Sequence, residues 1–317
     1  MTEIRFDDRV AIVTGAGNGL GREYALLLAA RGARVLVNDY GGNTMGSGRS
    51  EGPARDVVAE IEGSGGVAAA STDSVAESAG GAAIVAAALD RWGRVDIVVN
   101  NAGIADVGPA FEDLDDDRIH AFIETHLFGA FNVLRPAWRA MRERGYGRIV
   151  NTSSNTALGI ANAFDYPAVK AGLIGLSRSL ALHGASLGIK VNVIMPLAAT
   201  RMSAQVADPK VRKWIAETFP PRKVAPLLAW LCHESVPVSG EIFSCGGGRA
   251  ARVMTTVIPG LKQDEPTPES IREQWEVVMS GGDPVVALDG SVDAQMMDDG
   301  FASIAGSSVG SERSESS

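Results

Sequence analysis

The amino-acid sequence predicts an α/β protein with a doubly wound parallel sheet, made as a single domain with a C-terminal extension. Two observations predict this fold class. Short apolar runs alternate with longer helix-like segments over about the first 250 residues, which is the pattern of repeated β-α-β units. Continuous apolar runs such as Val95-Asp96-Ile97-Val98-Val99 are typical of parallel strands that are covered by helices on both faces.

The elements are expected in a regular order along the chain. Glycine and polar clusters separate the apolar runs and indicate turns between them. Strands are predicted at Val10–Thr14, Ala33–Asn38, Gly66–Ala70, Val95–Val99, Arg148–Thr152, Lys190–Met195 and Glu241–Ser244. Helices are predicted at Arg22–Arg31, Asp113–Arg144 and Phe164–Leu187, with a capped helix at Thr267–Val278.

The composition narrows the class of partner. A net charge of −9 disfavours attachment to nucleic acid or to an anionic membrane, so we expect neither and favour a small molecule. The chain begins with acidic residues where a signal peptide would be basic and then apolar, and only Cys232 and Cys245 are present, which favours a cytoplasmic protein. The four histidines lack the paired spacing of metal ligands, so no metal site is expected.

A glycine-rich turn follows the first predicted strand. It reads Thr14-Gly15-Ala16-Gly17-Asn18-Gly19-Leu20-Gly21 and leads into the first helix. Residues without side chains let the backbone approach a pyrophosphate closely, and a helix N-terminus offers free N–H groups to it. We therefore expect a dinucleotide to be held here, by Gly15, Asn18, Gly19, Leu20 and Gly21.

Other cofactor ligands are expected where the following strands end. Asp39 closes the second strand, and its carboxylate can accept hydrogen bonds from the ribose hydroxyls of NAD while repelling the 2′-phosphate of NADP. Arg49 lies in the glycine-rich loop that follows, which we expect to rim the cofactor site, and an arginine there could attract that phosphate. Asp73 and Ser74 follow the third strand beside the expected adenine, and Asn101, Ala102 and Gly103 follow the fourth.

A tyrosine and a lysine four residues apart begin a later helix. Tyr166 and Lys170 share one helical face, so the lysine cation and the nicotinamide charge could lower the pKa of the phenol and fit it for acid/base work. Pro167 is compatible with this if Tyr166 lies in the first helical turn. Ser153 and Ser154 end the preceding strand. Ser154 is favoured by the strand register and Ser153 by the spacing to Tyr166.

Together these segments resemble the short-chain dehydrogenase/reductase family. The resemblance spans about residues 7–250 and rests on T-G-x-x-x-G-x-G at Thr14–Gly21, N-N-A-G at Asn100–Gly103, the serine, and Tyr-x-x-x-Lys. It implies a Rossmann fold and an NAD-dependent oxidoreductase, with Tyr166 as the acid/base. Although Pro196 lacks the glycine that usually follows it in the family, Thr200 can still meet the nicotinamide amide.

Within the family, the chain looks most like the (3R)-hydroxyacyl-CoA dehydrogenase part of peroxisomal multifunctional enzyme type 2 and its bacterial relatives. This narrower match rests on Val37–Gly42 with its long loop, Thr125–Gly129, Gly145–Val150 and Trp230–Ser235. His126 stands where the family usually has an asparagine that orders a proton-relay water. Two readings are open for His126, a part in the catalytic relay and a packed, hydrogen-bonded core residue.

The resemblance implies oxidation of a (3R)-3-hydroxyacyl-CoA to the 3-ketoacyl-CoA with NAD, with Arg201, Arg249 and Arg252 as candidates for the CoA phosphates. A hydroxysteroid or other hydrophobic-alcohol dehydrogenase is the alternative, and a non-catalytic dinucleotide-binding subunit is a third reading. A homodimer or homotetramer is implied. Residues 1–250 are expected to form the NAD-binding catalytic domain, 251–305 an extension that covers the substrate side, and 306–317 a disordered tail.

Overall fold

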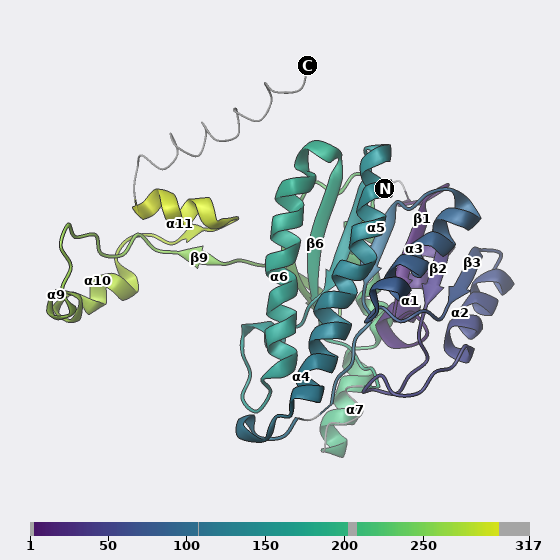
Figure 1. Cartoon of the computed structure of the whole chain (residues 1–317), viewed down its shortest axis with the longest axis horizontal. Coiled ribbons are helices and arrows are strands. Elements are labelled where there is room, and N and C mark those ends of the chain that lie inside the picture. The colour runs from purple at the N-terminus through teal and green to yellow at the C-terminus, as the bar shows by residue number, and fades with distance from the viewer. Residues whose placement is uncertain (1–2, 107, 202–207, 298–317) are drawn as a thin grey trace. The chain divides into compact units, whose positions relative to one another are not determined.

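The structure is a computed structural model that describes residues 3–106, 108–201 and 208–297. The chain divides into two compact units, Met1–Arg252 and Val253–Ser317. The predicted tail at 306–317 lies outside the described residues. The first unit holds the sheet and is described first (Figure 1).

One eight-stranded sheet forms the centre of the first unit, in the order β3-β2-β1-β4-β5-β6-β7-β8. Every pair from β3 to β7 is parallel, so the predicted doubly wound sheet is confirmed. The seven expected strands are all present with ends moved by up to two residues, and β8 adds an edge strand after a two-residue turn. The strands are β1 Val10–Thr14, β2 Arg34–Asn38, β3 Val67–Ser71, β4 Ile97–Asn100, β5 Gly147–Thr152, β6 Ile189–Pro196, β7 Ile242–Gly246 and β8 Arg249–Val253.

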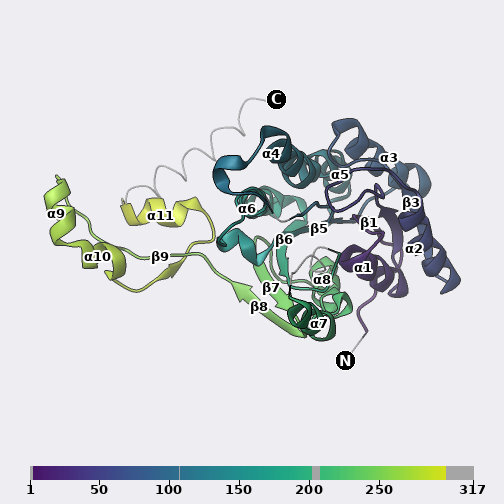
Figure 2. The same cartoon turned by 90° about the horizontal axis from the view of Figure 1, so that it is seen from below.

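Helices cover both faces of this sheet, as Figure 2 shows when the strands are viewed nearly end-on. Successive residues of a strand point to opposite faces, and β1 illustrates this: Ala11 and Val13 join one core, whereas Val10 and Ile12 join the other. The first core packs against α1, α2 and α8, and the second against α3, α5 and α6. The helices are α1 Gly19–Ala30, α2 Gly52–Gly63, α3 Ser78–Trp92, α4 Asp116–Phe122, α5 Gly129–Arg144, α6 Asp165–Gly184, α7 Pro209–Thr218 and α8 Ala225–Cys232.

The helical segment expected at Asp113–Arg144 is not a uniform α-helix. It begins at Asp116, where Asp115 caps the backbone N–H of Arg118, and a π-helical stretch at Ile123–Phe128 separates α4 from α5. A π-helical turn widens the ladder by one residue and often marks a functional site. The helix expected at Phe164–Leu187 is confirmed as α6, which ends at Gly184 and continues as a short 3₁₀ turn at Ala185–Leu187.

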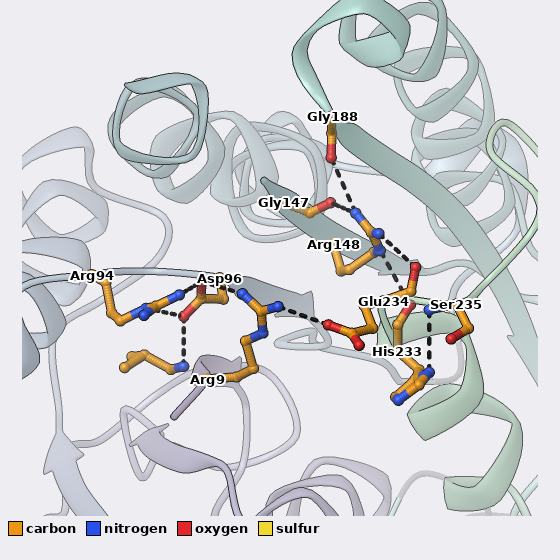
Figure 3. A network of polar contacts seen from close by, with 10 residues as sticks. Arg9, Arg94, Asp96, Gly147, Arg148, Gly188, His233, Glu234 and Ser235 are labelled. Atoms are coloured by element: carbon orange, nitrogen blue, oxygen red, sulfur yellow. Dashed lines mark hydrogen bonds and ion pairs between the residues drawn. The ribbon is translucent and has the colours of Figure 1, made fainter. Parts of the chain in front are cut away.

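A polar network ties the strands together at the amino end of the sheet (Figure 3). The side chain of Asp96 is fully buried and accepts hydrogen bonds from the backbone N–H of Val10 and from both ends of the Arg94 fork. The guanidinium of Arg148 donates to four carbonyl oxygens, which belong to Gly147, Gly188, His233 and Glu234. These contacts join β1, β4 and β5 to the end of α8.

The second unit contains a short antiparallel pair, β9 Thr256–Val257 and β10 Val285–Val286. The capped helix expected at Thr267–Val278 begins as predicted, since Thr267 and Ser270 form a reciprocal capping box. It is broken into α9 Pro268–Glu273 and α10 Trp275–Ser280, because Gln274 leaves the helical conformation. The last described helix is α11 Gly290–Met297. Among the residues described, no helix combines the length and the apolar character needed to cross a membrane.

Candidate active site

The glycine turn between β1 and α1 has the conformation that its composition predicts. Gly15 and Gly19 have φ angles of +61° and +52°, which residues with a side chain rarely adopt. Asn18 is the N-cap of α1 but makes no side-chain cap, and no acidic residue lies in the first helical turn. The N-terminus of α1 therefore presents backbone N–H groups and a positive dipole end to the cavity above it.

Gly21 differs from the prediction, because it does not line this cavity. A Cβ atom on Gly21 would lie 2.2 Å from the carbonyl oxygen of Gly15 and 2.6 Å from the side-chain nitrogen of Asn101. Glycine is required there so that the first turn of α1 can pack against the strand end and the loop after β4. The role of Gly21 is thus close packing, while Gly15, Asn18, Gly19 and Leu20 face the cavity.

Asp39 lies where the sequence predicts it, just beyond the end of β2 and on the cavity wall. Its two carboxylate oxygens each accept a hydrogen bond of 2.8 Å, one from the backbone N–H of Gly17 and one from that of Gly41. These bonds hold the carboxylate at the expected adenosine end. Arg49 contacts the next residue, with its guanidinium 5.8 Å from the Tyr40 ring centroid, and it donates to the hydroxyl of Thr72.

The residues after β3 and β4 divide into cavity lining and support. Asn101 fixes the turn below the cavity, since its side-chain nitrogen donates to the carbonyl oxygens of Thr14 and Gly15 at 3.1 Å each. Ala102, Gly103 and Ser74 line the cavity as expected. Asp73 directly precedes Ser74, and one of its carboxylate oxygens accepts from the hydroxyl of Ser71 at 2.9 Å. A place beside the adenine stays a prediction for Asp73.

Tyr166, Lys170 and Ser154 converge at the other end of the same cavity. Tyr166 is the second residue of α6, so Pro167 falls in the first turn, where a missing N–H is tolerated. The ammonium of Lys170 lies 5.3 Å from the Tyr166 ring centroid and donates to the carbonyl oxygen of Thr152 at 2.7 Å. Burial is nearly complete for Lys170, which is 3% exposed.

The two candidate serines have different environments. Ser153 is buried, and its hydroxyl donates to the backbone carbonyl oxygen of Lys170 at 2.7 Å, which anchors α6 on β5. The hydroxyl of Ser154 accepts from the backbone N–H and the hydroxyl of Thr156, and its side chain interacts with Tyr166. The hydroxyl of Ser154 also lies 3.3 Å from the side-chain oxygen of Asn155. This geometry favours Ser154, as the strand register does, as the group that holds a substrate oxygen.

His126 lies in the π-helical stretch and is buried against Tyr166. Its ring centroid is 5.3 Å from that of Tyr166, and Nε2 lies 2.8 Å from the carbonyl oxygen of Ile104. Nε2 also lies 3.2 Å from the backbone N–H of Ile104, so the backbone of Ile104 meets this nitrogen with both a donor and an acceptor. Nδ1 is buried with no hydrogen-bond partner among the described residues. Both readings of His126 stay open, because the ring is packed and hydrogen-bonded yet leaves Nδ1 without a partner there.

Burial sets the pKa values of these groups in opposite directions. It raises the pKa of Tyr166 to about 12, which the hydrogen bond from Ser154 only partly offsets. It lowers the pKa of Lys170 to about 7, and it lowers the pKa of His126 well below its usual 6.5, with further repulsion from Lys170. The expectation that the lysine cation lowers the pKa of Tyr166 is not met in the protein alone, because the desolvation cost of the phenolate dominates.

The cavity has a volume of about 530 Å³ and runs from Asp39 to Tyr166. Thr200 lines it as predicted, and Arg201 lines it too, whereas Arg249 and Arg252 do not. Arg252 is instead paired with Glu241 at 2.7 Å. Among the residues that the structure describes, no group of three or more histidine, cysteine or acidic side chains could hold a metal ion.

This donor set fits a dinucleotide. One end offers a fixed carboxylate, the middle offers the backbone N–H groups of an uncapped helix N-terminus, and the far end offers Tyr166 and Lys170. Thr200 lies opposite Gly19, because a Cβ atom on Gly19 would lie 3.4 Å from its methyl group. A side chain at Gly19 would therefore narrow the cavity between the helix N-terminus and Thr200.

The loop between β2 and α2 extends further than the sequence indicates. It was expected to rim the cofactor site, and it also crosses to the loop after β4, where the carbonyl oxygen of Thr44 accepts from the N–H of Ala105 at 2.9 Å. Met45 packs there on the cluster of Ile104, Phe122 and Val169 beside Tyr166. The glycines predicted the loop, but no feature of the sequence indicates this second contact.

These features define an oxidoreductase that acts on CH–OH groups. The family model described as short chain dehydrogenase matches residues 9–210, and the chain belongs to that family. Mouse peroxisomal multifunctional enzyme type 2 is 43% identical over 284 residues, a match that covers 87% of this chain and 37% of that enzyme's length. A short-chain type dehydrogenase/reductase of Mycobacterium tuberculosis is 43% identical over 270 residues, covering 84% of this chain and 93% of that protein.

A solved structure is similar over the first unit. It is a 7α-hydroxysteroid dehydrogenase complexed with NADH and 7-oxo glycochenodeoxycholic acid, with a TM-score of 0.69 and 30% sequence identity. The match covers 78% of this chain and 98% of that one. The chain thus has relatives of nearly its own length as well as a relative in which the matching part is only about a third of a larger enzyme.

Proposed function

We propose that this protein oxidises a (3R)-3-hydroxyacyl-CoA to the 3-ketoacyl-CoA with NAD as the hydride acceptor. The observation that carries the proposal is the convergence of Ser154, Tyr166 and Lys170 at one end of a cavity whose other end is the carboxylate of Asp39. The acyl-CoA substrate is supported by the sequence resemblance and by the 43% identity to the multifunctional enzyme. In that reading Arg201, on the cavity wall, is a candidate contact for the CoA phosphates.

NAD in place of NADP is supported by Asp39. Both of its oxygens are held by backbone N–H groups at 2.8 Å, and among the described residues no ion pair joins this carboxylate to a cation, so its charge would repel a 2′-phosphate. Each held oxygen keeps a lone pair for a ribose hydroxyl. Asn18, Gly19 and Leu20 would hold the pyrophosphate, and Thr200 the nicotinamide amide.

The chain's own groups would carry the proton in this reaction. Ser154 would donate a hydrogen bond to the oxygen of the substrate hydroxyl, and Tyr166, as phenolate, would accept the proton of that hydroxyl. Bound NAD would supply the hydride acceptor for the carbon that bears the hydroxyl, and its nicotinamide charge would favour the phenolate, because burial alone raises the pKa of Tyr166 to about 12. Lys170, whose ammonium lies 5.3 Å from the Tyr166 ring centroid, would pass the proton onward, and the ring of His126 packs against the same tyrosine.

Assembly and location are part of the same proposal. We expect a homodimer or homotetramer formed through α5 and α6, on which Phe131 and Leu182 are 38% and 57% exposed. A cytoplasmic location remains the expectation drawn from the two free cysteines, Cys232 and Cys245. Size-exclusion chromatography with light scattering tests the assembly.

A hydroxysteroid dehydrogenase is the alternative that a specific observation favours, namely the likeness to a structure holding a bile-acid ketone. The deciding assay follows NADH formation from matched (3R)- and (3S)-3-hydroxyacyl-CoA, with NADP and a panel of hydroxysteroids in parallel. We expect turnover of the R thioester alone and with NAD. Turnover of steroids alone would move the assignment to the alternative. No turnover of any alcohol would favour the non-catalytic subunit.

A further inference from the structure

An ion pair that the catalytic reading does not use lies directly against the active site. The guanidinium of Arg118, on α4, donates to the carboxylate of Asp165, the first residue of α6, at 2.6 Å. The two side chains are only 12% and 4% exposed. Most ion pairs in the described part of the chain are much more exposed, and an exposed pair contributes little to stability.

Asp165 is bonded to the peptide of the tyrosine itself. Its other carboxylate oxygen accepts from the backbone N–H of Tyr166 at 2.7 Å. Phe164, the N-cap residue of α6, has no side chain that can cap, so Asp165 satisfies this donor of the first turn. The carboxylate of Asp165 therefore links the start of α6 to α4. One oxygen bonds the backbone N–H of Tyr166 on α6, and the other bonds the guanidinium of Arg118 on α4.

Arg118 reaches two further parts of the site. Its Nη2 atom donates to the carbonyl oxygen of Asp106, in the loop after β4, at 3.3 Å. Its guanidinium carbon lies 4.8 Å from the Phe122 ring centroid, and that ring meets Tyr166 edge-on at 6.3 Å. The guanidinium is planar and donates in fixed directions, so it holds these neighbours in one arrangement better than a flexible ammonium would.

We propose that Arg118 and Asp165 form a positioning pair that holds Tyr166 at the distance and angle needed for proton transfer. This inference rests on the proposed function, because it concerns the same tyrosine. The pair joins α4, the loop after β4 and the first turn of α6, which together surround the Tyr166 ring. Proton transfer falls off steeply with small displacements, so loosening these contacts lowers kcat without touching the dinucleotide end of the cavity.

The test compares Arg118→Met, Arg118→Lys and Asp165→Asn in the full chain, with Arg55→Met as the matched control. Arg55 is paired with Glu51 on the exposed surface of α2, far from Tyr166 in the sequence. For Arg118→Met we expect kcat to fall at least about tenfold while the dissociation constant for NADH stays within about twofold. Arg118→Lys keeps the positive charge but not the planar guanidinium, so its kcat should lie between those of the wild type and Arg118→Met. The kcat of Arg55→Met should equal that of the wild type.

A second measurement does not need the substrate. The chain has four tyrosines, so ¹³C-labelled tyrosine gives four ring signals, and Tyr166→Phe identifies the one that belongs to Tyr166. We expect Asp165→Asn and Arg118→Met to shift or broaden that signal in the NADH-bound protein. If the wild type fails to oxidise hydroxyacyl-CoA, the proposed substrate is wrong, yet this signal still reports on the pair.

A purely structural pair would give a different result. The midpoint of thermal unfolding would fall, but the folded fraction of each variant would keep the wild-type kcat and an unshifted Tyr166 signal, and that result would overturn the proposal. If Arg118→Met does not fold, Arg118→Lys and Asp165→Asn decide. A wild-type kcat and an unchanged signal in both of these variants would equally overturn it.

Discussion

The two ends of the central sheet bury similar kinds of polar side chain but satisfy them differently. At the amino end, the Asp96 carboxylate and the Arg148 guanidinium are buried, and each makes several hydrogen bonds (Figure 3). The Tyr146 ring lies between two arginines there, 3.9 Å from the guanidinium of Arg9 and 4.4 Å from that of Arg148. Charges at this end are compensated by fixed partners.

At the carboxyl end, compensation is incomplete. Lys170 has one hydrogen-bond acceptor in the described residues, the carbonyl oxygen of Thr152, and no carboxylate is paired with it. The hydroxyl of Thr152 and Nδ1 of His126 are buried without a partner among the described residues. Burial consequently lowers the pKa of Lys170 to about 7 and raises that of Tyr166 to about 12.

The two ends of the sheet therefore use buried polar groups for different purposes, the amino end for stability and the carboxyl end for chemistry. A buried charge with its hydrogen bonds made is costly to disturb but does nothing near neutral pH, because its protonation does not change. A buried titratable group without a partner costs stability and gains a pKa that a ligand can move. Thr152 and His126 place two such unsatisfied polar atoms at the edge where a doubly wound sheet binds ligands.

The largest expected effect on kcat comes from removing the hydroxyl oxygen of Tyr166, at the carboxyl end of the sheet. Tyr166→Phe should lower kcat by about 10² to 10⁴, because general acid/base catalysis contributes on that scale. The affinity for NADH and the free energy of unfolding should change little. Among the described residues, Ser154 is the one side chain whose hydrogen bond affects the pKa of the Tyr166 hydroxyl, so few contacts are lost. Steady-state kinetics and fluorescence titration with NADH measure both. A variant that retains wild-type kcat would assign the acid/base to another group.

At the amino end of the sheet we expect the opposite result, a loss of stability without a loss of kcat. Arg148→Met removes a donor from the carbonyl oxygens of Gly147, Gly188, His233 and Glu234. Gly188 and His233 keep a backbone N–H donor, and each carbonyl oxygen left unsatisfied should lower the free energy of unfolding by about 1–3 kcal/mol. The kcat of the folded enzyme should remain that of the wild type. Urea unfolding and activity measured on the same samples test this. A selective loss of kcat would show that the two ends are coupled.

The pH dependence of the free energy of unfolding distinguishes the two ends of the sheet by a smaller effect. Between the native pKa of Lys170, about 7, and its usual 10.5, the unfolded chain binds one proton more than the native protein, so this lysine makes stability rise with pH. The rise is lost in Lys170→Met. The difference in free energy of unfolding between wild type and Lys170→Met should therefore grow by up to about 1.4 kcal/mol per pH unit from pH 7.5 to 9.5.

Arg148→Met is the control for that slope, because an arginine keeps its proton throughout this range. The difference in free energy of unfolding between the wild type and Arg148→Met should not change from pH 7.5 to 9.5. If the difference for Lys170→Met were also independent of pH, Lys170 would not be desolvated as its burial indicates.

The sequence predicted the parts of the site that depend on local order. The glycine turn, Asp39 and Asn101 each follow a strand directly, and parallel strands bring their carboxyl ends to one edge. The four-residue step from Tyr166 to Lys170 likewise sets a shared helical face. Asp73 satisfies the same local rule, although the order of residues did not indicate that the hydroxyl of Ser71 would bond one of its carboxylate oxygens.

Features that depend on packing could not be read from the order of residues. Arg118 and Asp165 are 47 residues apart, and nothing in either segment specifies the other as a partner. The same holds for Met45, which the loop after β2 carries to the cluster beside Tyr166. The raised pKa of Tyr166 also escaped prediction, because the desolvation cost depends on how many side chains finally cover the ring.

The smallest expected effects distinguish two adjacent serines. Ser153→Ala removes a hydrogen bond of 2.7 Å to the carbonyl oxygen of Lys170 and should lower the free energy of unfolding by about 1 kcal/mol with little change in kcat. Ser154→Ala should leave stability nearly unchanged, since the partners of its hydroxyl are near the surface, and should lower kcat by about tenfold or more, because the substrate oxygen loses a donor that acts in the transition state. Thermal unfolding and steady-state kinetics on both variants give the comparison. If Ser153→Ala had the larger effect on kcat, the spacing of thirteen residues to Tyr166, and not the strand register, would identify the catalytic serine.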